Sequence, residues 1–176
     1  MRHVFVINGS ASEGSANHFL IQAIEKLTKD RLTFTIFSGL KLLPHFDPEL
    51  TLEHTPKPIL DFRRGIEKAD GLLICTPEYV MSIPSGLKNA IEWCISTNVF
   101  FEKPTGLITA STMGKMGHRQ LQLIMETASA TLTKQAILLI PGIKSKFNDR
   151  GELNDKETSR KLVSFIAAFD DLILKR

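Results

Sequence analysis

Residues 76–93 read TPEYVMSIPSGLKNAIEW, and this stretch indicates how the chain folds. The five residues before it are mostly apolar and have the length of a buried strand. Pro77 and Pro84 prevent a continuous helix through the first half of the stretch. One helix face can be traced through Leu87, Ala90, Ile91, Cys94 and Ile95. The pattern therefore predicts a buried strand, a rigid loop and an amphipathic helix, and open α/β sheets bind ligands at such a place.

The rest of the chain repeats this alternation. Apolar or alternating runs predict further strands at residues 3–7, 32–37, 105–110 and 135–140, with amphipathic helices between them. Five strands alternating with five helices predict a parallel sheet covered by helices on both faces, which is an α/β fold. Residues 141–154 read as a polar connection before the last helix.

Length and composition limit the class of protein. The 176 residues, 43% hydrophobic and 23% charged, predict a single domain over 1–176 with a substantial core. A net charge of +3, with scattered Lys and Arg, favours no nucleic-acid partner. We see neither a signal peptide nor an apolar run of membrane-spanning length, so we expect no membrane partner and a cytoplasmic location. Cys75 and Cys94 are expected to be reduced core residues.

A small, hydroxyl-rich loop follows the first strand. Residues 8–15 read NGSASEGS, and a helix is predicted from Ala16. The amides and the dipole at the start of a helix form an anion site. Side-chain donors are available from Ser10, Ser12, Ser15 and Asn17. A second interpretation stays open, in which these serines only cap the helix.

The same loop can be compared with two known phosphate motifs. It lacks Gly-x-Gly-x-x-Gly, the dinucleotide fingerprint. Gly9 and Gly14 have P-loop spacing, but Ser15 occupies the position where that motif requires a lysine. A nucleotide triphosphatase is therefore not expected, and a monophosphate held by hydroxyls and amides fits better.

Three stretches resemble the NAD(P)H-dependent FMN reductase family, flavodoxin-like flavoproteins that include quinone, azo-dye and chromate reductases. Residues 9–17 are similar to its phosphate loop, Gly-Ser-x-Arg-x-Gly-Ser-x-Asn. Residues 77–93 are similar to Pro-Glu-Tyr-Asn-x-Ser-Ile-Pro-x-x-Leu-Lys-Asn-Ala-Ile-Asp-Trp, which is a highly specific motif. Residues 103–104 and 111–114 carry a weaker likeness.

The resemblance implies a flavodoxin-like, doubly wound, five-stranded parallel sheet of order 2-1-3-4-5. It implies FMN as cofactor, with the phosphate on the first loop and the isoalloxazine ring against the Pro-Glu-Tyr loop. Carried over by position, the residues expected to bind FMN are Ser10, Ser12, Ser15, Ala16, Asn17, Pro77, Glu78, Tyr79, Val80 and Ser111. We assign no catalytic side chain and no metal ligand.

The chain departs from the family pattern at three positions. Ser12 stands where the family has a phosphate-contacting arginine, so one charge-assisted contact is missing. Val80 replaces an asparagine, and Met81 replaces a small residue, often glycine. We expect Met81 to crowd the ring face or the nicotinamide pocket.

By this resemblance the protein is an oxidoreductase that passes hydride from NADPH or NADH, through flavin N5, to a small-molecule acceptor such as a quinone, an azo compound or a flavin. A homodimer or homotetramer is implied as well. The three departures keep an alternative open, a flavin-binding electron carrier or regulatory protein without rapid NAD(P)H turnover. A phosphate-binding hydrolase on the same topology is a third possibility.

Several other side chains receive structural interpretations. Trp93 and Lys88 are expected to be structural or at a subunit interface. His118 is expected to be a solvated residue at a helix start.

Overall fold

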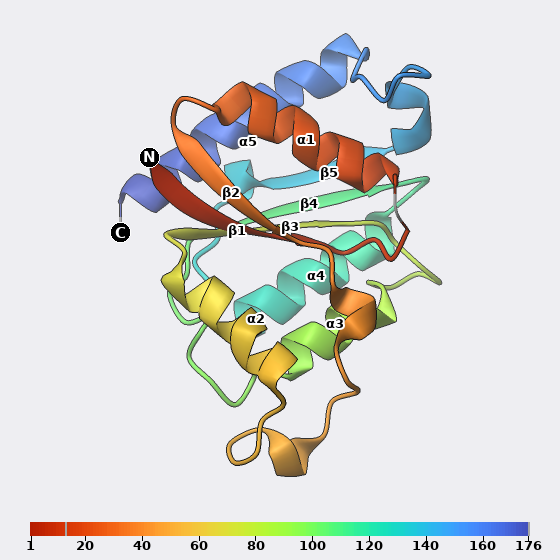
Figure 1. The fold of residues 1–176 in the computed structure, drawn as a ribbon. Helices are drawn as coiled ribbons and strands as arrows, with labels where there is room; N and C mark the ends of the chain where they lie inside the picture. Colours follow the sequence, from red (N-terminus) through yellow and green to blue (C-terminus); the bar gives the residue numbers. More distant parts are fainter. Residues whose placement is uncertain (13, 176) are drawn as a thin grey trace.

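The computed structural model describes residues 1–12 and 14–175 of the chain (Figure 1). Within these residues, five parallel strands form one sheet in the order β2-β1-β3-β4-β5. The strands are β1 (Arg2–Asn8), β2 (Leu32–Phe37), β3 (Gly71–Thr76), β4 (Thr105–Ser111) and β5 (Ile137–Pro141). This confirms the predicted flavodoxin-like, doubly wound sheet.

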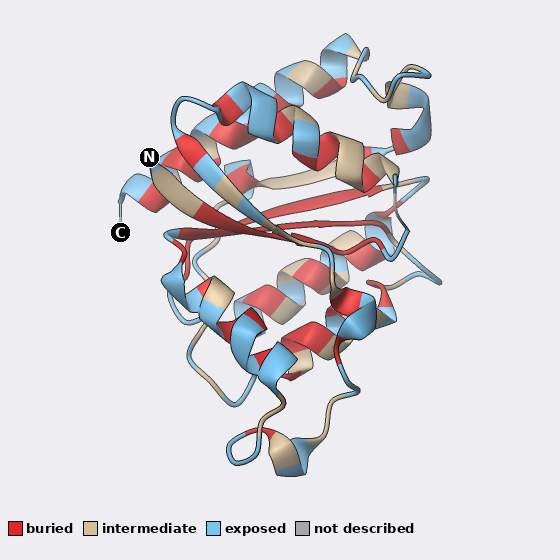
Figure 2. Cartoon of the chain, in the orientation of Figure 1, coloured by how far each residue is buried: buried red, intermediate tan, exposed pale blue. Residues whose placement is uncertain are grey.

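Helices cover both faces of the sheet (Figure 1). The helices α1 (Ala16–Thr28) and α5 (Lys156–Leu174) lie on one face, and α2 (Lys57–Lys68), α3 (Ser85–Glu92) and α4 (Lys115–Thr127) lie on the other. Each face has its own apolar core. Every residue of β3 is buried, because this central strand is covered from both sides (Figure 2).

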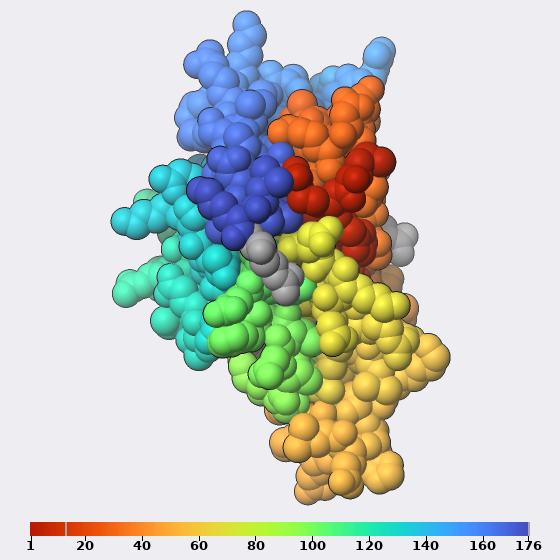
Figure 3. All heavy atoms as spheres, turned by 90° about the vertical axis from the view of Figure 1, so that its left-hand side faces the viewer, coloured from red at the N-terminus to blue at the C-terminus, as the bar shows by residue number. Residues whose placement is uncertain are grey.

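Short 3-10 helices occupy the connections: η1 (Leu40–Leu42), η2 (Pro48–Leu50), η3 (Lys134–Ala136) and η4 (Ile143–Lys146). The segment that carries η2 projects from the molecule below α2 and α3 (Figures 1 and 3). No helix in the described part of the chain has the length and hydropathy needed to cross a membrane.

Two elements differ from their predicted bounds by more than one residue. The fifth strand starts at Ile137, because Gln135 belongs to the 3-10 turn η3. Helix α3 ends at Glu92, earlier than its apolar stripe suggests. The Cys94 amide donates to the Ile91 carbonyl at 2.9 Å, a tighter turn than an α-helix makes, and Ile95 is 58% exposed.

Helix α3 is fixed to the connection between β2 and α2 by polar contacts. Trp93 is fully buried, and its Nε1 donates to the Pro44 carbonyl at 2.9 Å. Asn89 donates to the same carbonyl at 2.9 Å and accepts from the Phe46 amide at 2.7 Å. Of the two roles expected for Trp93, the structural one is therefore correct. Lys88 is exposed and pairs with Glu92 of its own helix.

Both cysteines are buried and neither forms a disulfide, which confirms their interpretation as reduced core residues. Burial raises the pKa of the Cys94 thiol to about 12 and also raises the pKa of Cys75. Because the thiolate is the reactive form, both side chains are chemically inert at neutral pH.

The loops after β1 and β3 touch at the carboxyl edge of the sheet. The Gly9 amide donates to the Cys75 carbonyl at 2.8 Å. A Cβ atom on Gly9 would lie 2.3 Å from the Thr76 hydroxyl oxygen and 3.0 Å from the Thr76 Cα. A residue with any side chain would force the two loops apart, so this position requires glycine.

We predict that Gly9→Ala lowers the free energy of unfolding by roughly 1 to 3 kcal/mol, since the added methyl group overpacks a fixed contact. Urea unfolding followed by circular dichroism measures this change. Gly86→Ala is the matched control, because a Cβ there meets only an ordinary contact at 3.5 Å to Leu40. Wild-type stability in Gly9→Ala would contradict the packing described above.

Candidate functional site

A cavity of about 730 Å³ opens at the carboxyl edge of the sheet. Four segments line it: the start of α1 with the loop before it, residues 77–79 after β3, residues 110–112 at the end of β4, and residues between 143 and 149 after β5. All the residues expected to bind FMN line this cavity except Val80. Parallel strands bring these separate loops to one edge.

The β1–α1 loop forms the first wall with hydroxyls and amides. The Ser15 Oγ accepts from the His18 amide at 3.2 Å and so caps α1. The Ser10 Oγ accepts from the Ser12 amide at 3.3 Å, and the Ser10 amide donates to Asn8 Oδ1 at 3.1 Å. The capping interpretation is therefore correct for Ser15, and the same residue also faces the cavity at the positive end of the helix dipole.

Asn17 also lines the cavity, but its side-chain amide bonds to the core. Its Nδ2 donates to the Ala110 carbonyl at 3.1 Å, and its Oδ1 accepts from the Cys75 thiol at 3.4 Å. Asn17 is only 3% exposed. Its side chain therefore ties α1 to β3 and β4.

The loop after β3 forms the second wall. Tyr79 and Ser82 exchange two backbone hydrogen bonds, of 2.9 and 3.0 Å, around Val80 and Met81. These two residues have φ values of 49° and 60°, as in a type I′ turn, which favours Asn-Gly. Val80 is 97% exposed, and the described lining of the cavity includes neither turn residue. Met81, which was expected to crowd the ring face or the nicotinamide pocket, therefore does not line this cavity.

This wall is tied to α4 by side chains. The Glu78 Oε2 accepts from the Gly117 amide at 2.7 Å, in the first turn of α4, where the helix dipole favours a carboxylate. The Ser82 hydroxyl contacts Gln120 Oε1 at 2.6 Å, and the Ser111 hydroxyl donates to the Glu78 carbonyl at 3.5 Å. Glu78 therefore acts as a brace that holds the loop in place.

The third wall follows β4 and includes Ser111 and Thr112. Behind it, His118 Nδ1 lies 2.9 Å from the Thr109 hydroxyl oxygen. Burial of the imidazole lowers the pKa of His118, which favours the neutral ring at pH 7. His118 lies in the first turn of α4, as predicted, but its side chain is half-buried against Thr109 of β4 and is not fully solvated.

The fourth wall was missed by the sequence analysis. Gly142 has φ 63° and donates its amide to the Thr112 carbonyl at 3.0 Å, which brings η4 to the rim of the cavity. Ile143 is buried, and the Phe147 ring lies 5.9 Å from that of Phe19 in α1. These isolated apolar residues in a polar run were the signal that the segment packs against the domain.

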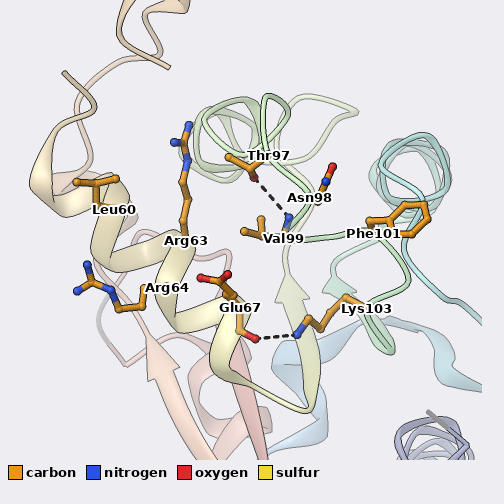
Figure 4. Close-up of a pocket in the computed structure, with 9 residues that line it drawn as sticks. All are labelled: Leu60, Arg63, Arg64, Glu67, Thr97, Asn98, Val99, Phe101 and Lys103. Carbon is orange, nitrogen blue, oxygen red and sulfur yellow. Dashed lines mark hydrogen bonds between the residues drawn. The ribbon is translucent and has the colours of Figure 1, made fainter. Parts of the chain in front are cut away.

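A second cavity, of about 400 Å³, lies between α2 and residues 97–103, on the side where the strands begin (Figures 3 and 4). Its buried cations are already bonded to carbonyls. Arg63 Nε donates to the Trp93 carbonyl at 2.8 Å, and Lys103 Nζ donates to those of Glu67 and Ala69 at 3.2 and 2.7 Å. These bonds hold helix ends together, so we assign the functional site to the larger cavity.

The larger cavity fits a ligand with a phosphate and a flat ring. The start of α1 offers amides and hydroxyls to an anion, and Pro77 is buried in a loop braced at Glu78. The volume lies within the range of small-molecule sites. One cation, Lys144, is among the described residues that line it.

Comparisons with known proteins identify one family for this chain. Residues 2–143 match the family model described as NADPH-dependent FMN reductase. An NAD(P)H:quinone oxidoreductase of Solanum tuberosum is 30% identical over 95% of this chain and 90% of its own length. The quinone reductase of Escherichia coli K12 is 28% identical over 97% and 94%.

A solved structure agrees with these relatives. FerB, a flavoenzyme NAD(P)H:(acceptor) oxidoreductase from Paracoccus denitrificans, superposes with a TM-score of 0.88 and 28% identity, over 99% of this chain and 98% of that one. The predicted enzyme class, an oxidoreductase, and the predicted cofactors, FMN with NAD(P)H, are confirmed. The chain belongs to the NADPH-dependent FMN reductase family.

Proposed function

We propose that this enzyme uses FMN bound in the 730 Å³ cavity to reduce a small quinone with NAD(P)H. The observation that carries the proposal is the single cavity that joins the start of α1 to the braced loop after β3. Relatives named for quinone reduction support the choice of acceptor. They include a 2-hydroxy-1,4-benzoquinone reductase of a Burkholderia species, 28% identical over 93% of this chain.

Different residues would bind the phosphate and the ring of FMN. The amides at the start of α1, with Ser10, Ser12, Ser15 and Ala16, would hold the phosphate. The backbone of Pro77, Glu78 and Tyr79 would support one face of the ring, with Ser111 at its edge. When bound, FMN supplies the redox chemistry, accepting hydride from NAD(P)H and delivering two electrons to the acceptor. The protein contributes position and a rigid wall, so no side chain is assigned as acid or base.

We also propose that the whole chain works as one domain, in the cytoplasm, as a homodimer or homotetramer. The packing of α5 onto the family-matched part of the sheet supports one domain. Two large apolar side chains support association, since Ile95 is 58% and Leu123 is 63% exposed beside a cavity of about 300 Å³ between α3 and α4. Light scattering of the purified protein checks the oligomeric state.

The function is tested by absorption spectroscopy. We predict that the protein retains FMN absorption through gel filtration, that NADPH added without oxygen bleaches these bands, and that a benzoquinone restores them. The physical reason is that the cavity both holds the cofactor and leaves it open to small molecules. Bound flavin that NADPH fails to bleach would favour the electron-carrier alternative. Absence of FMN binding would overturn both flavoprotein hypotheses.

The brace at Glu78 gives a second test. We predict that Glu78→Ala weakens FMN binding roughly tenfold, because the Gly117 amide loses its acceptor and the loop loses its anchor. Fluorescence titration with FMN measures the dissociation constant. Glu78→Gln keeps an acceptor oxygen and should bind FMN within about twofold of wild type.

Glu92→Ala serves as the control for loss of a carboxylate, because Glu92 pairs with Lys88 on the surface of α3. Its FMN affinity should match that of wild type. The bracing role would be contradicted by a Glu78→Ala variant that binds FMN as tightly as wild type.

A further inference from the structure

We propose that Lys144, on η4 after β5, supplies the positive charge that recognises the phosphate group of the flavin. The proposal rests on the proposed function, since it concerns the same cavity. It names a residue for cofactor selectivity that no sequence motif in the chain indicated.

The charge of the cavity wall favours Lys144. In the part of the β1–α1 loop that the structure describes, the lining residues are uncharged: Ser10, Ser12, Gly14, Ser15, Ala16 and Asn17. Hydroxyls and amides bind a phosphate, but they leave most of its charge without a counter-ion. The charged side chains that line the cavity, among residues 1–12 and 14–175, are those of Glu78, Lys144 and Asp149.

These three charged groups have different roles. The Glu78 carboxylate is bonded to the Gly117 amide at 2.7 Å. The Asp149 carboxylate would repel a phosphate, so it increases the need for a cation on the same wall. Lys144 is therefore the described lining residue that can offset a phosphate charge.

The segment that carries Lys144 is anchored on both sides. The Gly142 amide donates to the Thr112 carbonyl at 3.0 Å, and Ile143 is only 4% exposed. On the other side of Lys144, the Phe147 ring packs 5.9 Å from Phe19, whose amide bonds to the Ser15 carbonyl in the first turn of α1. Lys144 thus lies between two anchors, one on the β4–α4 loop and one on the start of α1.

The ammonium group of Lys144 is available to a ligand. Lys146, two residues further on, pairs with Asp155 at 3.3 Å. Lys144 is exposed and, within the described chain, forms no ion pair with a carboxylate. Its ammonium group can therefore turn toward a ligand without breaking a contact in the protein.

Lys41 is another cation near the β1–α1 loop. It lines two smaller cavities, one of about 340 Å³ together with Ser12 and His18 and one of about 310 Å³ together with Tyr79. Neither of these cavities includes Ser15 or Ala16 at the start of α1. Lys41 also already takes part in an interaction within the chain. Lys144 instead lines the cavity that contains both the start of α1 and residues 77–79.

The test compares FMN with riboflavin, which carries the same ring without the phosphate. We predict that Lys144→Gln weakens FMN binding about three- to tenfold in low salt and leaves riboflavin binding unchanged, as expected for one partly exposed charge contact. Quenching of flavin fluorescence gives both dissociation constants. High salt should shrink the difference between the variant and wild type, because exposed charges are screened.

Two further variants complete the design. Asp149→Asn should tighten FMN binding without changing riboflavin binding. Its effect is opposite to that of Lys144→Gln because it removes a negative charge. Lys134→Gln is the control for net charge, because Lys134 lies in η3 at the other end of β5. It should bind both flavins as wild type does.

The proposal is overturned by equal effects of Lys144→Gln on FMN and riboflavin, by no effect on either, or by a phosphate-dependent loss found in Lys41→Gln instead. Equal wild-type affinity for the two flavins would also overturn it and would leave the proposed function intact. Failure of wild type to bind either flavin would refute the proposed function itself.

Discussion

The close approach of Gly9 to Thr76 is the constraint on which the rest of the site depends. Because Gly9 has no side chain, the loop after β1 lies directly on the end of β3. The Gly9 amide donates to the Cys75 carbonyl at 2.8 Å. This contact aims the start of α1 and the loop after β3 at the same cavity. An anion site and a rigid wall then lie beside each other, which neither segment could provide alone.

The remaining walls are held by bonds between loops that are distant in sequence. Glu78 joins the loop after β3 to α4, and Asn17 joins α1 to Ala110 of β4. Gly142 joins the end of β5 to the β4–α4 loop through Thr112. These bonds within the protein brace the site, which limits the conformational entropy lost when a ligand binds.

The sequence predicts most of this fold because β3 is an uninterrupted apolar run and the other strands alternate with amphipathic helices. The sequence also predicts two walls of the cavity, because the serine-rich loop after β1 and the proline-bounded loop after β3 each have a recognisable local pattern. The direction of the Asn17 amide could not be predicted, because its partner lies 93 residues away. The left-handed turn at Val80 and Met81 could not be predicted, because neither residue favours a backbone conformation with positive φ. The wall at residues 143–149 could not be predicted, because its apolar residues follow neither the helical nor the strand period.

The central claim is that four loops at the carboxyl edge form one FMN site. The most direct measurement is a titration of ¹⁵N-labelled protein with FMN, followed through its amide resonances. Binding at this site predicts that the largest shifts fall on the first turn of α1, on residues 78–79, on residues 111–112 and on the segment around Lys144. Shifts centred instead on the cavity beside Arg64 and Phe101, with these four loops unchanged, would contradict it.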